Sequence, residues 1–227
     1  MTRSALLLLP GTLADERLWE GQLAALSEHA EVQIPDLTQH NDIGKAADTI
    51  LQTAPETFAL AGFSMGGIIA QEIVKRAPGR VERLALLDTS TGVPASAKRE
   101  RFQSWKEASR DTFDALLNTF VSWVHPENSN VIPSIGVPAR ELGVEVLRQQ
   151  AGILQSQHNE AETLHHLYGP ALILHGADDP VSTSEDNRLM ARHCQRARLI
   201  CLGTCGHYSP LEQPEAVSAA LQYWLQE

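Results

Sequence analysis

The stretch that decides the fold of this chain is Phe58-Ala59-Leu60-Ala61-Gly62-Phe63-Ser64-Met65-Gly66-Gly67. It begins as a short apolar run, which is typical of a buried strand. The residues that follow it, 68–76, carry the pattern of a helix. A Gly-x-Ser-x-Gly motif between a strand and a helix predicts a nucleophile elbow, a tight turn that exposes the hydroxyl of Ser64.

Such a turn places strict demands on its residues. We expect a positive φ at Ser64, and glycine at positions 62 and 66 because side chains there would crowd the strand and the helix. The same motif also occurs by chance in many proteins. The rest of the chain must therefore supply a base, an acid and donors for an oxyanion.

Apolar runs alternate with helical patterns on both sides of the elbow. This alternation predicts βαβ units and a parallel sheet, whose ligands bind beyond the carboxyl ends of the strands. The expected strands are 5–9, 31–34, 58–61, 81–87, 171–174 and 197–202.

The alternation stops between the fourth and fifth strands. Helical patterns cover 98–109, 111–124 and 139–157, and a breaker-rich link is expected at 131–138. We therefore expect a helical insertion at 95–167 that forms a lid over the strand ends. Residues 1–94 and 168–227 would form the core.

Candidate reactive side chains follow three of the expected strands: Ser64, the pair Asp178-Asp179, and His207. A serine hydroxyl needs a base within hydrogen-bond reach, and an imidazole that titrates near neutrality can serve. A carboxylate on the other ring nitrogen would orient that imidazole. Asp88 also ends a strand, but we expect it to bond loop backbone.

An oxyanion that forms at Ser64 needs fixed N–H donors. The backbone N–H of Met65 lies at the expected start of the helix. The second donor would come from the loop after the first strand, at Thr12 or, as an alternative, Leu13.

Together these motifs resemble the α/β-hydrolase superfamily over essentially the whole chain. The elbow at 62–67 matches, as does the histidine loop, Gly206-His207 followed by Pro210 to Pro214. In the acid turn at 172–181, the family's carboxylate stands three residues after the glycine, which implies Asp179 rather than Asp178. The loop at 9–12 resembles the family's oxyanion loop, with Pro10 where many members have histidine.

The resemblance implies an α/β-hydrolase fold with a reduced, mostly parallel sheet of about six strands, because an antiparallel hairpin has no room before Ala5. It implies hydrolysis of a small or medium acyl ester through Ser64, His207 and Asp179, with no metal or organic cofactor. A serine nucleophile argues against dehalogenase and epoxide hydrolase chemistry. A thioesterase, a C–C bond hydrolase and a non-catalytic ligand-binding protein stay open as alternatives.

The net charge and the composition limit the classes of partner that we expect for this protein. A net charge of −10 argues against binding to nucleic acids and anionic membranes. No apolar stretch approaches the roughly 20 residues of a membrane span. Three cysteines without a C-x-x-C pair favour reduced thiols in the cytoplasm. We expect a small-molecule acyl substrate, and the oligomeric state is left open.

Overall fold

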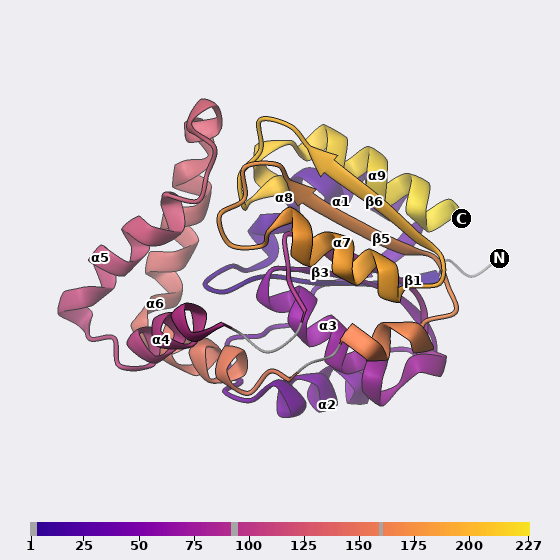
Figure 1. Ribbon diagram of the computed structural model, residues 1–227, viewed down its shortest axis with the longest axis horizontal. Helices are drawn as coiled ribbons and strands as arrows, with labels where there is room; N and C mark the ends of the chain where they lie inside the picture. The colour runs from indigo at the N-terminus through magenta and orange to yellow at the C-terminus, as the bar shows by residue number, and fades with distance from the viewer. Residues whose placement is uncertain (1–3, 92–94, 159–160) are drawn as a thin grey trace.

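The computed structural model describes residues 4–91, 95–158 and 161–227. Six strands form one sheet, in the order β2-β1-β3-β4-β5-β6, and every neighbouring pair is parallel. This architecture confirms the predicted sheet of about six strands (Figure 1). The strands are β1 (Ser4–Leu9), β2 (Ala30–Gln33), β3 (Phe58–Phe63), β4 (Val81–Leu87), β5 (Ala171–Gly176) and β6 (Ala197–Leu202).

The centre of the sheet is buried on both faces. All six residues of β3 and all six of β5 are buried, which is why these strands read as continuous apolar runs. The edge strand β6 is exposed or half-buried at each of its six residues. The hydrophobic core therefore lies on the two sides of β1, β3, β4 and β5.

Helices cover both faces of the sheet (Figure 1). On one face α1 (Glu20–Ser27) packs against α9 (Pro214–Gln226), and on the other α2 (Ile43–Thr53) packs against α3 (Met65–Arg76). The helix α7 (Ser184–His193) lies over β5 and β6. The shorter helices are η1 (Glu16–Trp19), η2 (Pro78–Arg80), η4 (Ala161–His166) and α8 (Ser209–Glu212).

The sheet order changes direction at β1. The chain runs from β1 outward to β2 and then returns to β3 on the other side of β1. Loops that follow β1 and β3 therefore leave the sheet in opposite directions and open a crevice between them. These two loops carry Thr12 and Ser64, so the topology alone brings the predicted site residues to one edge.

Between β4 and β5 the described residues form helices and no strand. These are α4 (Ser96–Lys106), α5 (Arg110–Val121), η3 (Pro126–Val131) and α6 (Ile132–Gln155). The helix α6 packs against both α4 and α5. The three long helices form a group beside the carboxyl ends of the strands, on the left in Figure 1.

One sequence expectation in this region is wrong. Residues 131–138 were predicted as a link, but α6 already begins at Ile132. Pro133 lies in the first turn, where a backbone N–H has no intrahelical partner and its loss costs nothing. The real interruption comes later, at Gly143, whose φ of 81° and ψ of 177° separate two helical runs.

Candidate active site

Ser64 stands in a strained turn between β3 and α3. Its φ is 50° and its ψ is −115°, a conformation that non-glycine residues rarely adopt. The backbone N–H of Ser64 donates to the carbonyl of Leu87 at 2.9 Å, which fixes the turn to β4. A Cβ atom at Gly62 would collide with the backbone of Gly66, and one at Gly66 would collide with the carbonyl of Leu9. The elbow therefore needs both glycines, as the sequence predicted.

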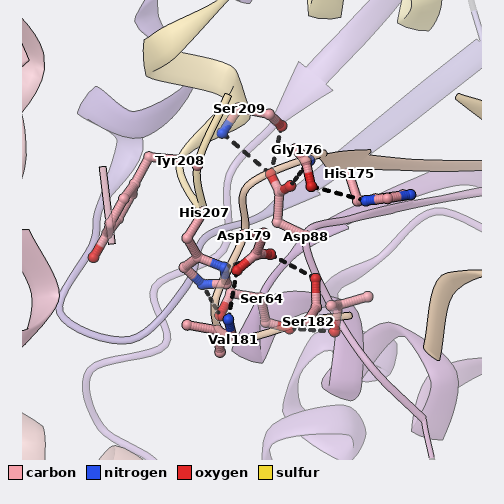
Figure 2. Close-up of polar contacts among 12 residues, drawn as sticks. Ser64, Asp88, His175, Gly176, Asp179, Val181, Ser182, His207, Tyr208 and Ser209 are labelled. Carbon is pink, nitrogen blue, oxygen red and sulfur yellow. Dashed lines mark hydrogen bonds and ion pairs between the residues drawn. The ribbon is translucent and has the colours of Figure 1, made fainter. Parts of the chain in front are cut away.

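The structure brings Ser64, His207 and Asp179 together in a chain of hydrogen bonds (Figure 2). The Nε2 atom of His207 lies 3.0 Å from the hydroxyl oxygen of Ser64. Its Nδ1 atom lies 2.9 Å from the Oδ2 atom of Asp179. If Nδ1 carries the proton and donates to the carboxylate, Nε2 is free to accept the serine proton. Such an arrangement can turn the hydroxyl into a nucleophile.

Asp179 is held as an anion by its surroundings. Burial alone would raise the pKa of this carboxyl, but the nearby imidazole of His207 and several hydrogen bonds outweigh burial and keep the pKa below its ordinary value. Besides His207, the carboxylate accepts from the backbone N–H of Val181 at 2.7 Å and from the hydroxyl of Ser182 at 2.6 Å. The carboxylate is therefore charged at neutral pH and fixed in orientation.

Ser182 bonds Asp179 instead of capping the helix that follows. Thr183 caps α7 by accepting from the backbone N–H of Asp186. Both residues can serve as N-caps, so the sequence alone does not choose between them. The shift by one residue leaves the hydroxyl of Ser182 free to bind Asp179.

The rival residues lie elsewhere. Asp178 has a side chain that is 54% exposed, and its carboxylate lies 3.7 Å from the imidazole of His125 rather than beside His207. His175 is buried, and its ring lies 2.9 Å from the carbonyl of Gly176. Figure 2 shows His175 beside Gly176 at the end of β5, away from Ser64.

Asp88 is fully buried behind the site. Its carboxylate accepts from the backbone N–H of Gly176 at 2.9 Å and from the backbone N–H and hydroxyl of Ser209. Burial and the nearby charge of Asp179 raise its pKa well above the ordinary value. As the sequence suggested, Asp88 bonds loop backbone, and it links the loop that carries Asp179 to the loop that carries His207.

Two backbone N–H groups are available beside Ser64. Met65 is the first residue of α3, and Thr12 lines the pocket beside Ser64. Over the described ranges neither N–H has a hydrogen-bond acceptor. The N–H of Leu13 is different, because it donates to the side-chain oxygen of Gln150 at 2.8 Å. Of the two alternatives in that loop, only Thr12 has an N–H without a partner.

The loop that carries His207 is fastened by Glu212, a residue whose role the sequence did not reveal. Its carboxylate accepts from the backbone N–H of Gly206 at 2.8 Å and from that of Tyr208 at 3.0 Å, on either side of the histidine. It also accepts from the backbone N–H of His125 at 3.0 Å. The N–H of His207 donates to the carbonyl of Trp123 at 2.9 Å. The histidine loop and the helical insertion are thus joined by direct bonds.

A pocket of about 380 Å³ opens over Ser64. One wall is an aromatic cluster of the insertion, in which Phe120 contacts the rings of Trp105 and Trp123 with centroids 5.0 and 4.9 Å apart. Trp123 also contacts His207 edge-on at 5.4 Å. Trp105 both lines the pocket and packs in the core. The fourth member of the cluster is Phe102.

Other kinds of site have little support in the described part of the chain. Over residues 4–91, 95–158 and 161–227, no three or more His, Cys, Asp or Glu side chains gather in a way that could hold a metal ion. The helices of the same ranges include none with the length and apolar character needed to cross a bilayer. Trp19 is fully buried in the core and does not line the pocket over Ser64.

Comparisons with known proteins agree with this fold. The model of the alpha/beta hydrolase family matches residues 6–220. The chain is 25% identical to a pimeloyl-[acyl-carrier protein] methyl ester esterase of Nitrosomonas europaea, over 92% of this chain and 91% of the relative. It is 26% identical to an (E)-2-((N-methylformamido)methylene)succinate hydrolase of Acinetobacter baylyi, over 97% and 90%.

Among solved structures, the enol-lactonase of Burkholderia xenovorans LB400 superposes with a TM-score of 0.86 at 19% identity. That match covers 100% of this chain and 93% of the enol-lactonase. At this level of identity the likeness concerns the fold.

Proposed function

Because the chain belongs to the alpha/beta hydrolase family, we propose that it is a serine hydrolase that cleaves a small or medium acyl ester. The observation that carries this proposal is the hydrogen-bonded chain from Ser64 through His207 to Asp179. A serine hydroxyl on a strained turn, an imidazole at 3.0 Å and a buried carboxylate form a set that acyl transfer requires and mere binding does not.

In the first half of the reaction, Ser64 attacks the carbonyl carbon of the ester while its proton passes to Nε2 of His207. Asp179 stabilises the imidazolium that results. The imidazolium then returns the proton to the leaving alcohol, and an acyl-enzyme on Ser64 remains. In the second half, His207 removes a proton from water, which hydrolyses the acyl-enzyme and frees the acid.

The backbone N–H groups of Met65 and Thr12 would hold the oxyanion of both tetrahedral intermediates. Both are free of other acceptors in the described ranges, and the Met65 N–H lies at the N-terminus of α3, where the helix dipole favours negative charge. The loss of one such donor raises a barrier by about 3–4 kcal/mol. We assign Thr12 rather than Leu13 because Gln150 occupies the N–H of Leu13.

The helical insertion, residues 95–167, would act as the lid of this site. Its aromatic cluster forms the wall of the pocket that faces Ser64. A pocket of about 380 Å³ suits a small or medium ligand. The insertion would determine which acyl groups fit.

Carboxylic esters are the first class of substrate. The Nitrosomonas relative is a methyl ester esterase by name, and its match spans almost the whole chain. A thioesterase and a C–C bond hydrolase would use the same three residues, and we rank them second. A ligand-binding protein on this scaffold would have no physical need for the bonded Ser64 and His207.

Chromogenic short-chain esters test the proposal. The Ser64→Ala variant should lose turnover by about five to six orders of magnitude, because removal of a triad nucleophile leaves only the oxyanion hole and binding. A fluorophosphonate probe should label the wild-type protein at Ser64 and leave the variant unlabelled. Ser129→Ala, which changes an exposed serine of η3, is the matched control and should keep full activity. Turnover that survives in Ser64→Ala would contradict the proposal.

A further inference from the structure

Two cationic side chains line the pocket on the side of the insertion. Lys98 and Arg101 stand three residues apart on α4, so they project from the same face of the helix. Both are half-buried rather than extended into solvent. In a chain with a net charge of −10, two neighbouring cations inside the pocket over Ser64 are an unusual local arrangement.

Neither cation has an acidic partner in the part of the chain that the structure describes. The amine of Lys98 has a single weak polar contact, with the hydroxyl of Ser90 at 3.4 Å. The guanidinium of Arg101 lies 5.6 Å from the ring centroid of Trp123. Some arginines outside the pocket do have an acidic partner: Arg17 contacts Asp15 at 2.6 Å and Arg198 contacts Glu227 at 2.8 Å.

The acidic side chains of the pocket do not neutralise these cations. Asp88 is committed to Gly176 and Ser209 and is fully buried. Asp186 accepts from the backbone N–H and the hydroxyl of Thr183 in the cap of α7. The positive charge of Lys98 and Arg101 is therefore available to a ligand that enters the pocket.

The guanidinium of Arg101 is separated from the reacting histidine by one aromatic ring, that of Trp123. Trp123 is in contact with Arg101 through its ring and with His207 edge-on at 5.4 Å. Thr91, which follows Ser90 in the chain, also lines the pocket, and its hydroxyl has no hydrogen-bond partner among the described residues. The pocket thus holds the proposed ester-cleaving residues together with Lys98, Arg101 and Thr91, which offer donors suited to an anion.

We propose that Lys98 and Arg101 form an anion subsite that binds a carboxylate carried by the ester substrate. The substrate class is then a half-ester of a dicarboxylic acid, with the ester at Ser64 and the free carboxylate on α4. Arginine presents paired N–H groups that match a carboxylate, and a half-buried position strengthens the attraction. This inference rests on the proposed ester hydrolysis, because it names the substrate of the same pocket.

A matched pair of substrates separates the two proposals. One is the neutral 4-nitrophenyl hexanoate, and the other is mono-4-nitrophenyl adipate, which has the same chain length and ends in a carboxylate. In Lys98→Gln and Arg101→Gln we expect kcat/KM for the half-ester to fall about tenfold to a hundredfold, the range for a lost charge-assisted bond. The value for the hexanoate should stay within about twofold, since the neutral ester makes no such bond.

Further experiments test whether any cation of α4 has the same effect, and whether the carboxylate belongs to the acyl or the alcohol part of the ester. Lys106→Gln removes an exposed cation of the same helix that does not line the pocket, and it should leave both substrates unchanged. Added salt should lower kcat/KM for the half-ester alone, because screening weakens the attraction. Hexanoyl glycolate carries its carboxylate on the alcohol part of the ester, and its hydrolysis is measured by pH-stat. Of the two charged esters, the one with the higher kcat/KM shows which part of the substrate carries the carboxylate that the subsite binds.

Binding of adipate to Ser64→Ala, measured by calorimetry, gives a reading that does not depend on turnover. Adipate binding that is lost in Ser64→Ala/Arg101→Gln supports the subsite even if no ester is cleaved, in which case the proposed hydrolysis fails alone. Hexanoate turnover together with equal losses for both esters in Arg101→Gln would overturn the subsite alone. Absence of adipate binding to Ser64→Ala would also overturn it.

Discussion

The two walls of the pocket are built by different physics. On the sheet side, short loops after β3, β5 and β6 hold Ser64, Asp179 and His207 by hydrogen bonds between 2.6 and 3.0 Å. On the insertion side, Phe102, Trp105, Phe120 and Trp123 are held by ring contacts with centroids 4.9 to 6.3 Å apart. Hydrogen bonds are directional and fix the reacting atoms, whereas ring packing tolerates changes of size. The first wall therefore holds the reacting atoms in a fixed geometry, and the second wall can change in size to fit a different substrate.

The sharpest way to break the sheet-side wall is Asp179→Asn. The amide keeps the shape but favours the wrong imidazole tautomer, so we expect kcat to fall about 10⁴-fold, as in serine proteases. Turnover assays with a short-chain ester measure this fall in kcat. Asp178→Asn, the neighbouring exposed carboxylate, should change kcat less than about threefold, because exposed ion pairs contribute little. A larger loss in Asp178→Asn than in Asp179→Asn would reverse the assignment of the acid.

On the insertion side, Trp105→Ala should act on stability. Trp105 is 3% exposed and stacks on Phe120, so truncation should lower the free energy of unfolding by about 3–5 kcal/mol. Urea unfolding measures this loss. At a temperature where the variant is folded, the rate of labelling by a small fluorophosphonate should change little, while the preference among acyl chain lengths shifts. An unchanged chain-length preference would show that the cluster does not shape the pocket.

Glu212→Gln tests the junction between the walls. The neutral amide keeps the volume but can accept with only one oxygen, so some of the N–H groups of Gly206, Tyr208 and His125 lose their acceptor. We expect the free energy of unfolding to fall by about 1–3 kcal/mol and kcat to fall with it. Glu215→Gln, an exposed change in α9, is the matched control. A stability loss without any change of kcat would mean that Glu212 does not position His207.

The effect of Asp88→Asn on stability should depend on pH. The raised pKa of Asp88 means that the folded state keeps a proton that the unfolded chain releases above about pH 3.9. The free energy of unfolding of the wild type should therefore fall, relative to that of the variant, as pH rises above about 3.9. The fall is at most about 1.4 kcal/mol per pH unit. Urea titrations from pH 4.5 to 8 measure the difference.

Asp179 should show the opposite sign. Its pKa is lowered, so its contribution to stability is complete above the ordinary carboxyl pKa and is lost as pH falls through the folded value. The difference in free energy of unfolding between wild type and Asp179→Asn should grow as pH rises toward the ordinary carboxyl pKa. If the stability differences for Asp88→Asn and Asp179→Asn changed with pH in the same direction, the opposite pKa shifts of the two carboxyls would be contradicted.

Much of the sheet-side wall could be predicted from the sequence, because each of its parts is local. The elbow, the acid turn and the histidine loop each lie within a dozen residues, and strands of a parallel sheet must deliver their carboxyl ends to one edge. The bounds of β4 and β6 agree with the expected runs 81–87 and 197–202. The catalytic roles of Ser64, Asp179 and His207, the lid and the cytoplasmic location stay predictions.

The rest depends on contacts between distant residues. Nothing near Gln150 indicates that its side chain would occupy the N–H of Leu13, 137 positions away in the chain. The pairing of Glu212 with His125 has the same character. The aromatic residues of the insertion did carry a local signal, since Phe102 with Trp105 and Phe120 with Trp123 are spaced at one helical turn. That spacing does not tell which face of a helix meets the pocket.

The carboxylate of Glu212 has a consequence for exchange of parts between relatives. It joins the histidine loop to the backbone of the insertion at His125 and the side chain of Asn128. A foreign insertion grafted onto this core would have to offer an N–H and an amide in the same places, or the histidine would lose its anchor. We expect viable chimaeras to retain residues 123–128 of this chain. The graft that changes substrate preference would then end before Trp123 or begin after Asn128, and it is smaller than the whole insertion.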